Sequence, residues 1–446
     1  MDLTSLIPGF GGTLWTVFFF ILALSIVVAV HEYGHYIIGR WSGIFAEVFS
    51  VGFGPVLISR IDRRGTKWQI AAIPFGGYVR FRGDAGPAGG IDGKAMVGGD
   101  ARSTMHGAPL WARTATVAAG PLFNFALSVV LFAAVFMLRG VASDPLVVDQ
   151  LRPVPYVQEL QAGDRILEIN AERLPSLEDG PAYNAFMQGL PFEAVLDYTV
   201  ERGDARLTVS GPYFHAPIVG GIQPRSAAMD AGLRSGDVIL QVNEQEIFAF
   251  SQLAEVIEKG QGAPVSLGIW RGGETLSLEL TPRRMDEPLS EGGFRTVYRI
   301  GIASGMLFEP ASHSPGLMLS LWGGTLRVWD VITGSLSGLY HMITGQISSC
   351  NLSGPVGIAQ ASGDMASQGA LAFISFVALI STAIGLINLF PIPALDGGHL
   401  VFYAYEALRG RPPSDAALNI LMTFGIALVL GLMLFGLSND ILLCRP

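Results

Sequence analysis

Charged residues are scarce in this chain of 446 residues. They make up 15% of it, whereas they form about a quarter of an ordinary soluble domain. Half of the residues are hydrophobic, and the mean hydropathy is +0.45. The deficit of charge argues against a wholly soluble protein and indicates a membrane protein. The length allows several spanning helices together with one or two small domains of roughly 100 residues each.

The sequence also lacks any long run of basic residues, and its formal net charge is −9. Nucleic acid is therefore not expected as a partner. Cysteine is nearly absent too: Cys350 and Cys444 lie far apart and form no CxxC metal knuckle. They could pair in an oxidising compartment, but we favour two free thiols. The N-terminus lacks a basic region and a small-residue cleavage site, so no cleavable signal peptide is expected.

What the chain does have is four long apolar stretches. Crossing the hydrocarbon core of a bilayer takes roughly 20 apolar residues. Stretches of this length run over approximately residues 13–38, 110–138, 371–390 and 416–437. They predict four transmembrane helices.

Basic residues in two connections between these spans predict the orientation. Residues 39–109 include Arg63 and Arg64, and the short connection 406–414 carries Arg409 and Arg411. The positive-inside rule places both connections in the cytoplasm. The long connection 139–369, which is acidic on balance, then lies outside, as do both termini.

The first connection has the pattern of a β-hairpin. Apolar residues recur in 48–53 and again in 68–73, and Asp62-Arg63-Arg64-Gly65 between them reads as a turn.

The long connection contains a repeated pattern. Gly163-Asp164 and Gly236-Asp237 each precede an alternating strand that ends in Asn170 or Asn243. This pattern resembles PDZ domains, which bind peptides by adding a strand to a sheet edge. The resemblance is closer for residues 217–283 than for 141–215, where Pro153 and Pro155 argue against a working groove. A β-rich spacer is the alternative. The groove candidates in the second module are Ile218, Val219, Gly220, Gly221 and Ile222.

A zinc-site motif closes the first span. In His31-Glu32-Tyr33-Gly34-His35 the two histidines are four apart, so one helical face presents both imidazoles to one ion. Glu32 would stand beside a metal-bound water as general base. The alternative is a solvated helical face with two histidines. The motif follows an unbroken apolar run, however, where these polar groups are costly unless a metal compensates them.

A catalytic zinc site with three protein ligands needs one more. Asp396 is an isolated carboxylate at the end of the third span. Pro391 and Pro393 interrupt the helix before it, and broken backbone at membrane depth is tolerated only where it is buried in protein or lines a wet cavity. Asp396 could alternatively cap the next helix. We favour Asp396 as the third ligand, ahead of His399.

Together these motifs resemble the site-2 protease family of intramembrane zinc metalloproteases. The resemblance covers nearly the whole chain and rests on His31-Glu32-x-x-His35, on the stretch from Asn388 through Pro391 and Pro393 to Asp396-Gly397, and on the PDZ-like modules between them. Gly52-Phe53-Gly54-Pro55 and Asn351-Leu352-Ser353-Gly354-Pro355-Val356-Gly357 also match stretches found in that family.

The resemblance implies the following roles. His31, His35 and Asp396 would hold one Zn²⁺ ion, and Glu32 would be the catalytic base. Substrate would be contacted by Asn388, Pro391 and Pro393, and held as a strand by the hairpin. The family cleaves single-span membrane proteins after a first cut by another protease. A bacterial branch of it acts on an anti-sigma factor and on remnant signal peptides, with the PDZ pair as a size filter.

The predicted fold is a polytopic α-helical membrane protein with four transmembrane helices, a membrane-associated β-hairpin and two tandem PDZ-like α+β domains. It would lie in the bacterial inner membrane with the PDZ domains in the periplasm. Residues 315–347 are apolar with Trp322 and Trp329. They predict a helix that lies on the outer membrane surface or packs on the PDZ pair. The expected parts are 1–40, 41–109, 110–140, 141–215, 216–285, 286–370, 371–405 and 406–446.

Two other classes of function compete with an intramembrane protease. A catalytically silent scaffold that presents PDZ modules predicts a lost base, yet Glu32 is present. A metal or proton transporter fits four spans and two PDZ-like modules poorly.

Overall fold

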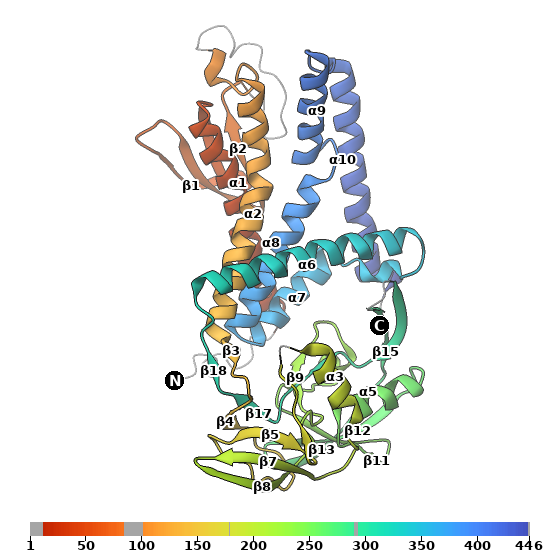
Figure 1. Cartoon of the computed structure of the whole chain (residues 1–446). Coiled ribbons are helices and arrows are strands. Elements are labelled where there is room, and N and C mark those ends of the chain that lie inside the picture. The colour runs from red at the N-terminus through yellow and green to blue at the C-terminus, as the bar shows by residue number, and fades with distance from the viewer. Residues whose placement is uncertain (1–11, 84–100, 178, 290–292, 445–446) are drawn as a thin grey trace. The chain divides into compact units, whose positions relative to one another are not determined.

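The computed structural model describes residues 12–83, 101–177, 179–289 and 293–444 (Figure 1). The chain divides into two compact units. The first comprises the described parts of residues 1–135, 317–340 and 349–445, and the second those of 136–316 and 341–348.

Long apolar helices build the first unit. Within the described residues, four helices are long and apolar enough to cross a membrane, and they match the predicted spans. They are α1 (Thr13–Trp41), α2 (Leu110–Arg139), α8 (Ala370–Leu389) and α10 (Asp415–Ser438), which continues as the π-helical turn η5 (Asn439–Leu443). The other helices that begin in this unit are η3 (Ala101–Ser103), α6 (Leu317–Ile343), η4 (Ser349–Asn351), α7 (Pro355–Ser367) and α9 (Asp396–Arg409).

Small and polar residues hold the spanning helices together. A Cβ atom on Gly34 of α1 would lie 2.6 Å from the carbonyl oxygen of Ala119 on α2, so the two backbones touch there. The hydroxyl of Ser128 donates to the carbonyl of Ala378, and that of Ser381 donates to the carbonyl of Asn124. Close approach and buried hydroxyl bonds of this kind are how helices associate where water provides no driving force.

The predicted hairpin is present between α1 and α2 as β1 (Ala46–Ile61) and β2 (Lys67–Phe81). Both strands bend, so that residues 46–51 pair with 77–81 and also with 67–70. Gly52, with a φ of +93°, permits the bend, because a Cβ atom there would lie 2.8 Å from the carbonyl oxygen of Ala71. The outer half of the hairpin is apolar and exposed: Ile58 is 69% and Leu57 is 66% accessible.

Helix α6 packs on the spanning helices by one face. Its buried residues are Ser320, Gly324 and Val328, and Val328 belongs to an apolar cluster with Phe132 and Ala378 of α2 and α8. Trp322 and Trp329 point away from this contact and are 60% and 63% exposed.

The second unit contains two modules whose four-stranded sheets have the same topology. The sheet of the first has the strand order β6-β5-β7-β8, and that of the second β11-β10-β12-β13. The first comprises β5 (Arg165–Ile169), β6 (Glu172–Arg173), α3 (Gly180–Gly189), β7 (Leu196–Arg202) and β8 (Ala205–Gly211). The second comprises β9 (Val219–Ile222), α4 (Ala227–Asp230), β10 (Val238–Val242), β11 (Gln245–Glu246), α5 (Phe250–Lys259), β12 (Val265–Arg271) and β13 (Glu274–Leu280).

Short antiparallel pairs complete this unit. They are β14 (Arg283–Pro288) with β15 (Phe294–Arg299), β16 (Ile302–Ser304) with β9, β17 (Phe308–Pro310) with β4 (Val148–Leu151), and β18 (Ser312–His313) with β3 (Val141–Ala142).

The repeat seen in the sequence recurs in the atomic contacts. Asp164 is buried and bonds to Arg202 at 2.7 Å, and Asp237 bonds to Arg271 at the same distance in the second module. Burial raises the pKa of the Asp164 carboxyl, but the hydrogen bonds from Arg202 and from the backbone of Gln161, together with the charge of Arg202, outweigh burial and hold this pKa below its usual value. The same Asp–Arg pair therefore occurs at the corresponding place in both modules.

Four of the five predicted groove residues, Val219 to Ile222, form β9, and Ile218 directly precedes this strand. One edge of β9 pairs with β16, and residues 217–219 bond to residues 236–239 on the other side. Strand addition needs an open edge, so a peptide has little room to pair at Ile218 and Val219. The cavity beside α5, of about 170 Å³, is lined instead by Leu253, Ile257 and the segment 300–302, among others.

The expectation of two free thiols is also wrong. Cys350, at the centre of η4, forms a disulfide with Cys444, just beyond η5. Both cysteines belong to the first unit, and 94 residues separate them in sequence. Spacing along the chain could not reveal the pairing, because the fold of α7 to α10 brings the two ends of this loop together.

Candidate metal centre

Helix α1 presents the motif as predicted. His31 and His35 lie one turn apart on the face toward α2, with their rings 4.8 Å apart between centroids. Their Nε2 atoms are 3.1 Å apart, and only 8% of His31 is accessible. The two rings therefore point their Nε2 atoms at one location.

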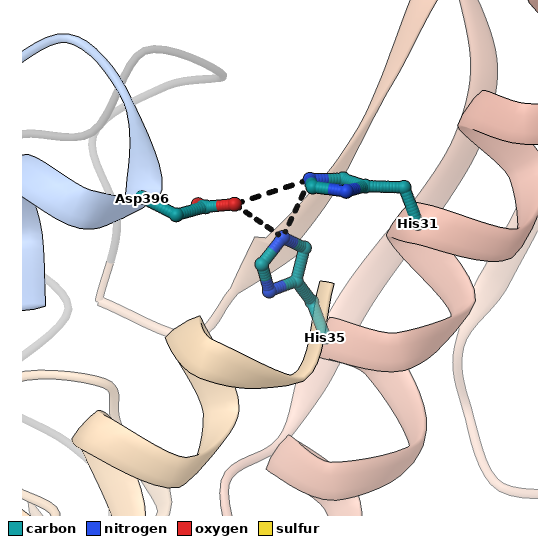
Figure 2. A group of neighbouring side chains, drawn as sticks. All are labelled: His31, His35 and Asp396. Carbon is teal, nitrogen blue, oxygen red and sulfur yellow. Dashed lines mark hydrogen bonds and ion pairs between the residues drawn. The ribbon is translucent and has the colours of Figure 1, made fainter. Parts of the chain in front are cut away.

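Asp396 reaches the same location from the far end of the chain (Figure 2). Its Oδ2 atom lies 3.2 Å from Nε2 of His31 and 3.5 Å from Nε2 of His35. The capping alternative fails, because Leu395 is the N-cap of α9 and no side chain caps that helix. Asp396 is the first helical residue, and its carboxylate faces the two imidazoles.

These three atoms fit one zinc ion. Zn–N and Zn–O bonds of about 2.0–2.2 Å in a tetrahedron place neighbouring ligand atoms roughly 3.3–3.5 Å apart, close to the separations of 3.1, 3.2 and 3.5 Å between the three atoms. The buried Oδ2 atom of Asp396 has no hydrogen-bond partner, as expected of an atom that is kept for a metal. Two imidazoles and one carboxylate form a donor set that is typical of catalytic zinc.

Glu32 borders the same cavity, which has a volume of about 360 Å³. The cavity also contains His31, His35 and Asp396 in its wall. A base beside the three ligands and open space in front of them are what a hydrolytic zinc site requires.

The bent end of β2 forms another wall of this cavity. Gly77, Tyr78, Val79 and Phe81 line it, and the backbone of Val79 hydrogen-bonds the carboxylate of Glu32. Residues 77–81 pair with 46–51, and this part of the sheet borders the cavity that His31, His35 and Asp396 also line.

The turn between α8 and α9 positions the remaining predicted residues. Asn388 lines the cavity, and its side-chain amide donates to the carbonyl of Ile384 at 3.0 Å. Pro391 is exposed, and Pro393 lies against Gly425 of α10. Neither proline is among the residues that line the cavity. His399 lines it but does not belong to the group of three ligand atoms, so it is not the third ligand.

Several residues around the site were not predicted from the sequence. Asn124 of α2 contacts His31, and the carbonyl of Thr116 contacts His35. A partly buried ion pair ties α2 to α9: Arg113 bonds both carboxylate oxygens of Glu406, at 3.0 and 2.7 Å. A polar residue inside an apolar span, such as Asn124, was the one available clue.

The comparisons with known proteins agree with this chemistry. The model of peptidase family M50 matches residues 19–432. A protein of Agrobacterium fabrum, provisionally named a zinc metalloprotease, is 34% identical over 95% of this chain and 94% of its own length. The regulator of sigma-E protease RseP of Salmonella typhimurium is 32% identical over 96% of this chain and 98% of its own length.

One solved structure, the PDZ domain of an SdrC-like protein from Listeria monocytogenes, is similar to part of this chain. The similar region covers 20% of this chain and 88% of the Listeria monocytogenes chain, with 17% sequence identity and a TM-score of 0.17. A similarity of this size carries no argument about the fold.

Proposed function

This chain belongs to peptidase family M50 and is a site-2 type zinc metalloprotease, and from this premise we propose that it cleaves single-span membrane proteins within or beside the bilayer. The observation that carries the proposal is the convergence of His31, His35 and Asp396 between helices that are apolar enough to span a membrane. We propose that they hold one Zn²⁺ ion.

When bound, zinc supplies Lewis-acid chemistry that polarises a carbonyl group and acidifies a water molecule. Glu32 would take the proton from the attacking water as the C–O bond forms and return it to the amine as the C–N bond breaks. The hydrogen bond from Val79 holds the carboxylate of Glu32 in place for this transfer. Asn388, on the cavity wall, contacts the substrate backbone.

The test is Glu32→Gln, which keeps the size and shape of the side chain and removes the base. The full-length variant purified in detergent should retain zinc and lose cleavage of a single-span reporter by at least a thousandfold. Glu255→Gln is the matched control, since this carboxylate is exposed and, among the residues that the structure describes, forms an ion pair with Lys259 of the same helix. A Glu32→Gln enzyme that still cleaves the reporter would refute the proposal.

We propose that the hairpin associates with the membrane and holds substrate as an added strand. A transmembrane helix hides its carbonyl groups in hydrogen bonds and must unwind before attack. The edge formed by residues 77–81 offers replacement backbone partners beside Glu32, so no polar group is left orphaned in an apolar medium. The exposed apolar side chains of the outer half, such as Ile58 and Ile61, suit contact with lipid.

We propose that the two modules of the second unit are PDZ-like and form a size filter that excludes substrates with an intact outer domain. Their shared strand order and their α5-type helix support this assignment. In the second module the cavity beside α5, with Ile300 and Ile302 on its wall, is the place for a peptide end.

We further propose the bacterial inner membrane as the location, with the modules in the periplasm. Substrates would include an anti-sigma factor, released by a first cut from another protease, and remnant signal peptides. The name of the Salmonella typhimurium relative supports the sigma-factor connection. The exposed Trp322 and Trp329 of α6, on the side opposite its contact with α2 and α8, support a helix that lies on the outer membrane surface.

A further inference from the structure

Helix α2 backs both histidine rings on the side away from Asp396. Nδ1 of His35 lies 2.8 Å from the carbonyl oxygen of Thr116. Nδ1 of His31 lies 3.2 Å from the side-chain amide of Asn124, a residue with no accessible surface. Both contacts are made from one helix, and both engage the nitrogen that does not face the other ligands.

The protonation of the two rings follows from this arrangement. The Nε2 atoms converge with Asp396, so each ring must leave Nε2 unprotonated to bind a metal. A neutral imidazole then carries its proton on Nδ1, which becomes a donor and needs an acceptor. The carbonyl of Thr116 is such an acceptor for His35. His31 needs an equivalent acceptor, because leaving a buried donor unpaired destabilises the fold.

Asn124 can supply that acceptor. Its amide presents oxygen and nitrogen in interchangeable positions after a half-turn of the terminal group. In the present rotamer Nδ2 faces His31, and Oδ1 is buried without a hydrogen-bond partner. The half-turn would bring the unsatisfied oxygen within 3.2 Å of His31 Nδ1. An orphaned buried acceptor and a ring nitrogen that requires one thus lie side by side.

We propose that Asn124 is a positioning residue: its Oδ1 atom accepts a hydrogen bond from Nδ1–H of His31 and fixes the tautomer whose Nε2 atom binds zinc. The inference rests on the zinc site of the proposed function and assigns a role to a residue outside it. Acceptors of this second layer orient the ring and raise its basicity, and their removal typically costs 10–100-fold in metal affinity.

Two substitutions at this position separate the proposal from a packing role. Asn124→Leu keeps the approximate shape and removes both polar atoms. Asn124→Asp keeps an acceptor and removes the donor. Zinc affinity of the full-length protein in detergent is measured by competition with a chromophoric chelator. We expect Asn124→Leu to bind zinc about 10–100-fold more weakly and Asn124→Asp to stay within about threefold of wild type.

Ser128→Ala is the matched control. Ser128 is one turn further along α2 and fully buried, but its hydroxyl bonds only backbone carbonyls, those of Asn124 and Ala378. Its zinc affinity should equal that of wild type. Equal affinities for Asn124→Leu and wild type would overturn the proposal. A large loss of zinc affinity in Asn124→Asp would also overturn the proposal, because it would mean that Nδ2 of Asn124 donates to His31. This outcome tests the role of Asn124 even if the leucine variant does not fold.

Failure of the proposed function looks different in the same experiment. In that case wild type itself would bind no zinc or would not cleave the reporter when loaded. If wild type binds zinc and cleaves while the Asn124 variants behave contrary to expectation, only the role of Asn124 falls.

Discussion

At the scale of single residues, Gly120 shows how little room the site leaves. This glycine lies on α2 between Thr116 and Asn124. A Cβ atom at this position would be 2.3 Å from Nε2 of His35 and 2.8 Å from Cε1 of His31. Both rings would have to move, and they are the rings whose Nε2 atoms converge with Asp396 at the proposed zinc site. The close packing of α2 against α1 and the ligand geometry therefore depend on one missing side chain.

We predict that Gly120→Ala lowers zinc affinity at least tenfold, because the added methyl group displaces the ligand atoms from positions that match the short bonds of zinc. Chelator competition on the purified protein measures the change. Gly431→Ala in α10 is the control, since a Cβ atom there meets nothing within 4 Å and alanine favours a helix. Wild-type affinity in Gly120→Ala would show that the rings can adapt.

The residues of the site that could be predicted from the sequence are those whose neighbours in the sequence share in the same chemistry. The histidines and Glu32 stand within five consecutive positions, and their helical spacing already implies a shared ion. Asp396 was recognisable from the broken backbone before it. Asn124 and Thr116 act through one amide and one carbonyl in an apolar helix, and only the packing of α2 on α1 reveals which groups they face.

At the scale of elements, strand β2 contributes to the wall of the cavity in which the proposed reaction takes place. Residues 77–81 belong to the sheet and contribute to the cavity wall, and the backbone of Val79 hydrogen-bonds Glu32, the proposed catalytic base. A proline within this segment removes a backbone donor and kinks the strand. Such a proline should therefore weaken substrate binding and cleavage, and it should leave zinc binding by the residues on α1 and α9 unchanged.

We predict that Tyr78→Pro reduces cleavage of a single-span reporter at least tenfold and leaves the zinc content at the wild-type level. Its main kinetic effect should be a higher KM, because the strand edge would no longer pair with substrate. Arg63→Pro is the control: position 63 follows Asp62 in the exposed turn, where proline is favoured. Unchanged kinetics in Tyr78→Pro would contradict the role of the strand edge.

Elements whose patterns are local were predictable, and pairings between distant elements were not. The four spans and the hairpin turn all lie close to their predicted positions. The pairing of β9 with β16 joins segments that are about 80 residues apart, and the cavity beside α5 is lined by the segment 300–302 and not by β9. Alternating apolar residues mark a strand but do not name its partner.

At the scale of the whole molecule, the disulfide bears on orientation. Disulfides persist in the oxidising space outside the cytoplasm. The pair Cys350–Cys444 would therefore place the end of α10 outside. Because α10 is long enough to span, its beginning near Asp415 would lie inside, next to Arg409 and Arg411. The positive-inside rule gives the same orientation from entirely different residues.

We predict that both cysteines are protected in cells. In membranes denatured without reductant, a maleimide-polyethylene glycol reagent should leave the wild-type chain unshifted, and after reduction it should shift the chain by two adducts. Cys350→Ser should show one adduct under both conditions, since it leaves Cys444 unpaired.

The disulfide closes a loop that spans 94 residues of sequence, and such a loop contributes up to roughly 4–5 kcal/mol to the free energy of unfolding in water. Less is expected here, because spanning helices persist when the tertiary structure is lost, so Cys350→Ser should lower Tm by several degrees and leave zinc affinity unchanged. Two adducts on the unreduced wild-type chain would mean that these cysteines are not paired in the cell, and the orientation would then rest on the basic residues alone.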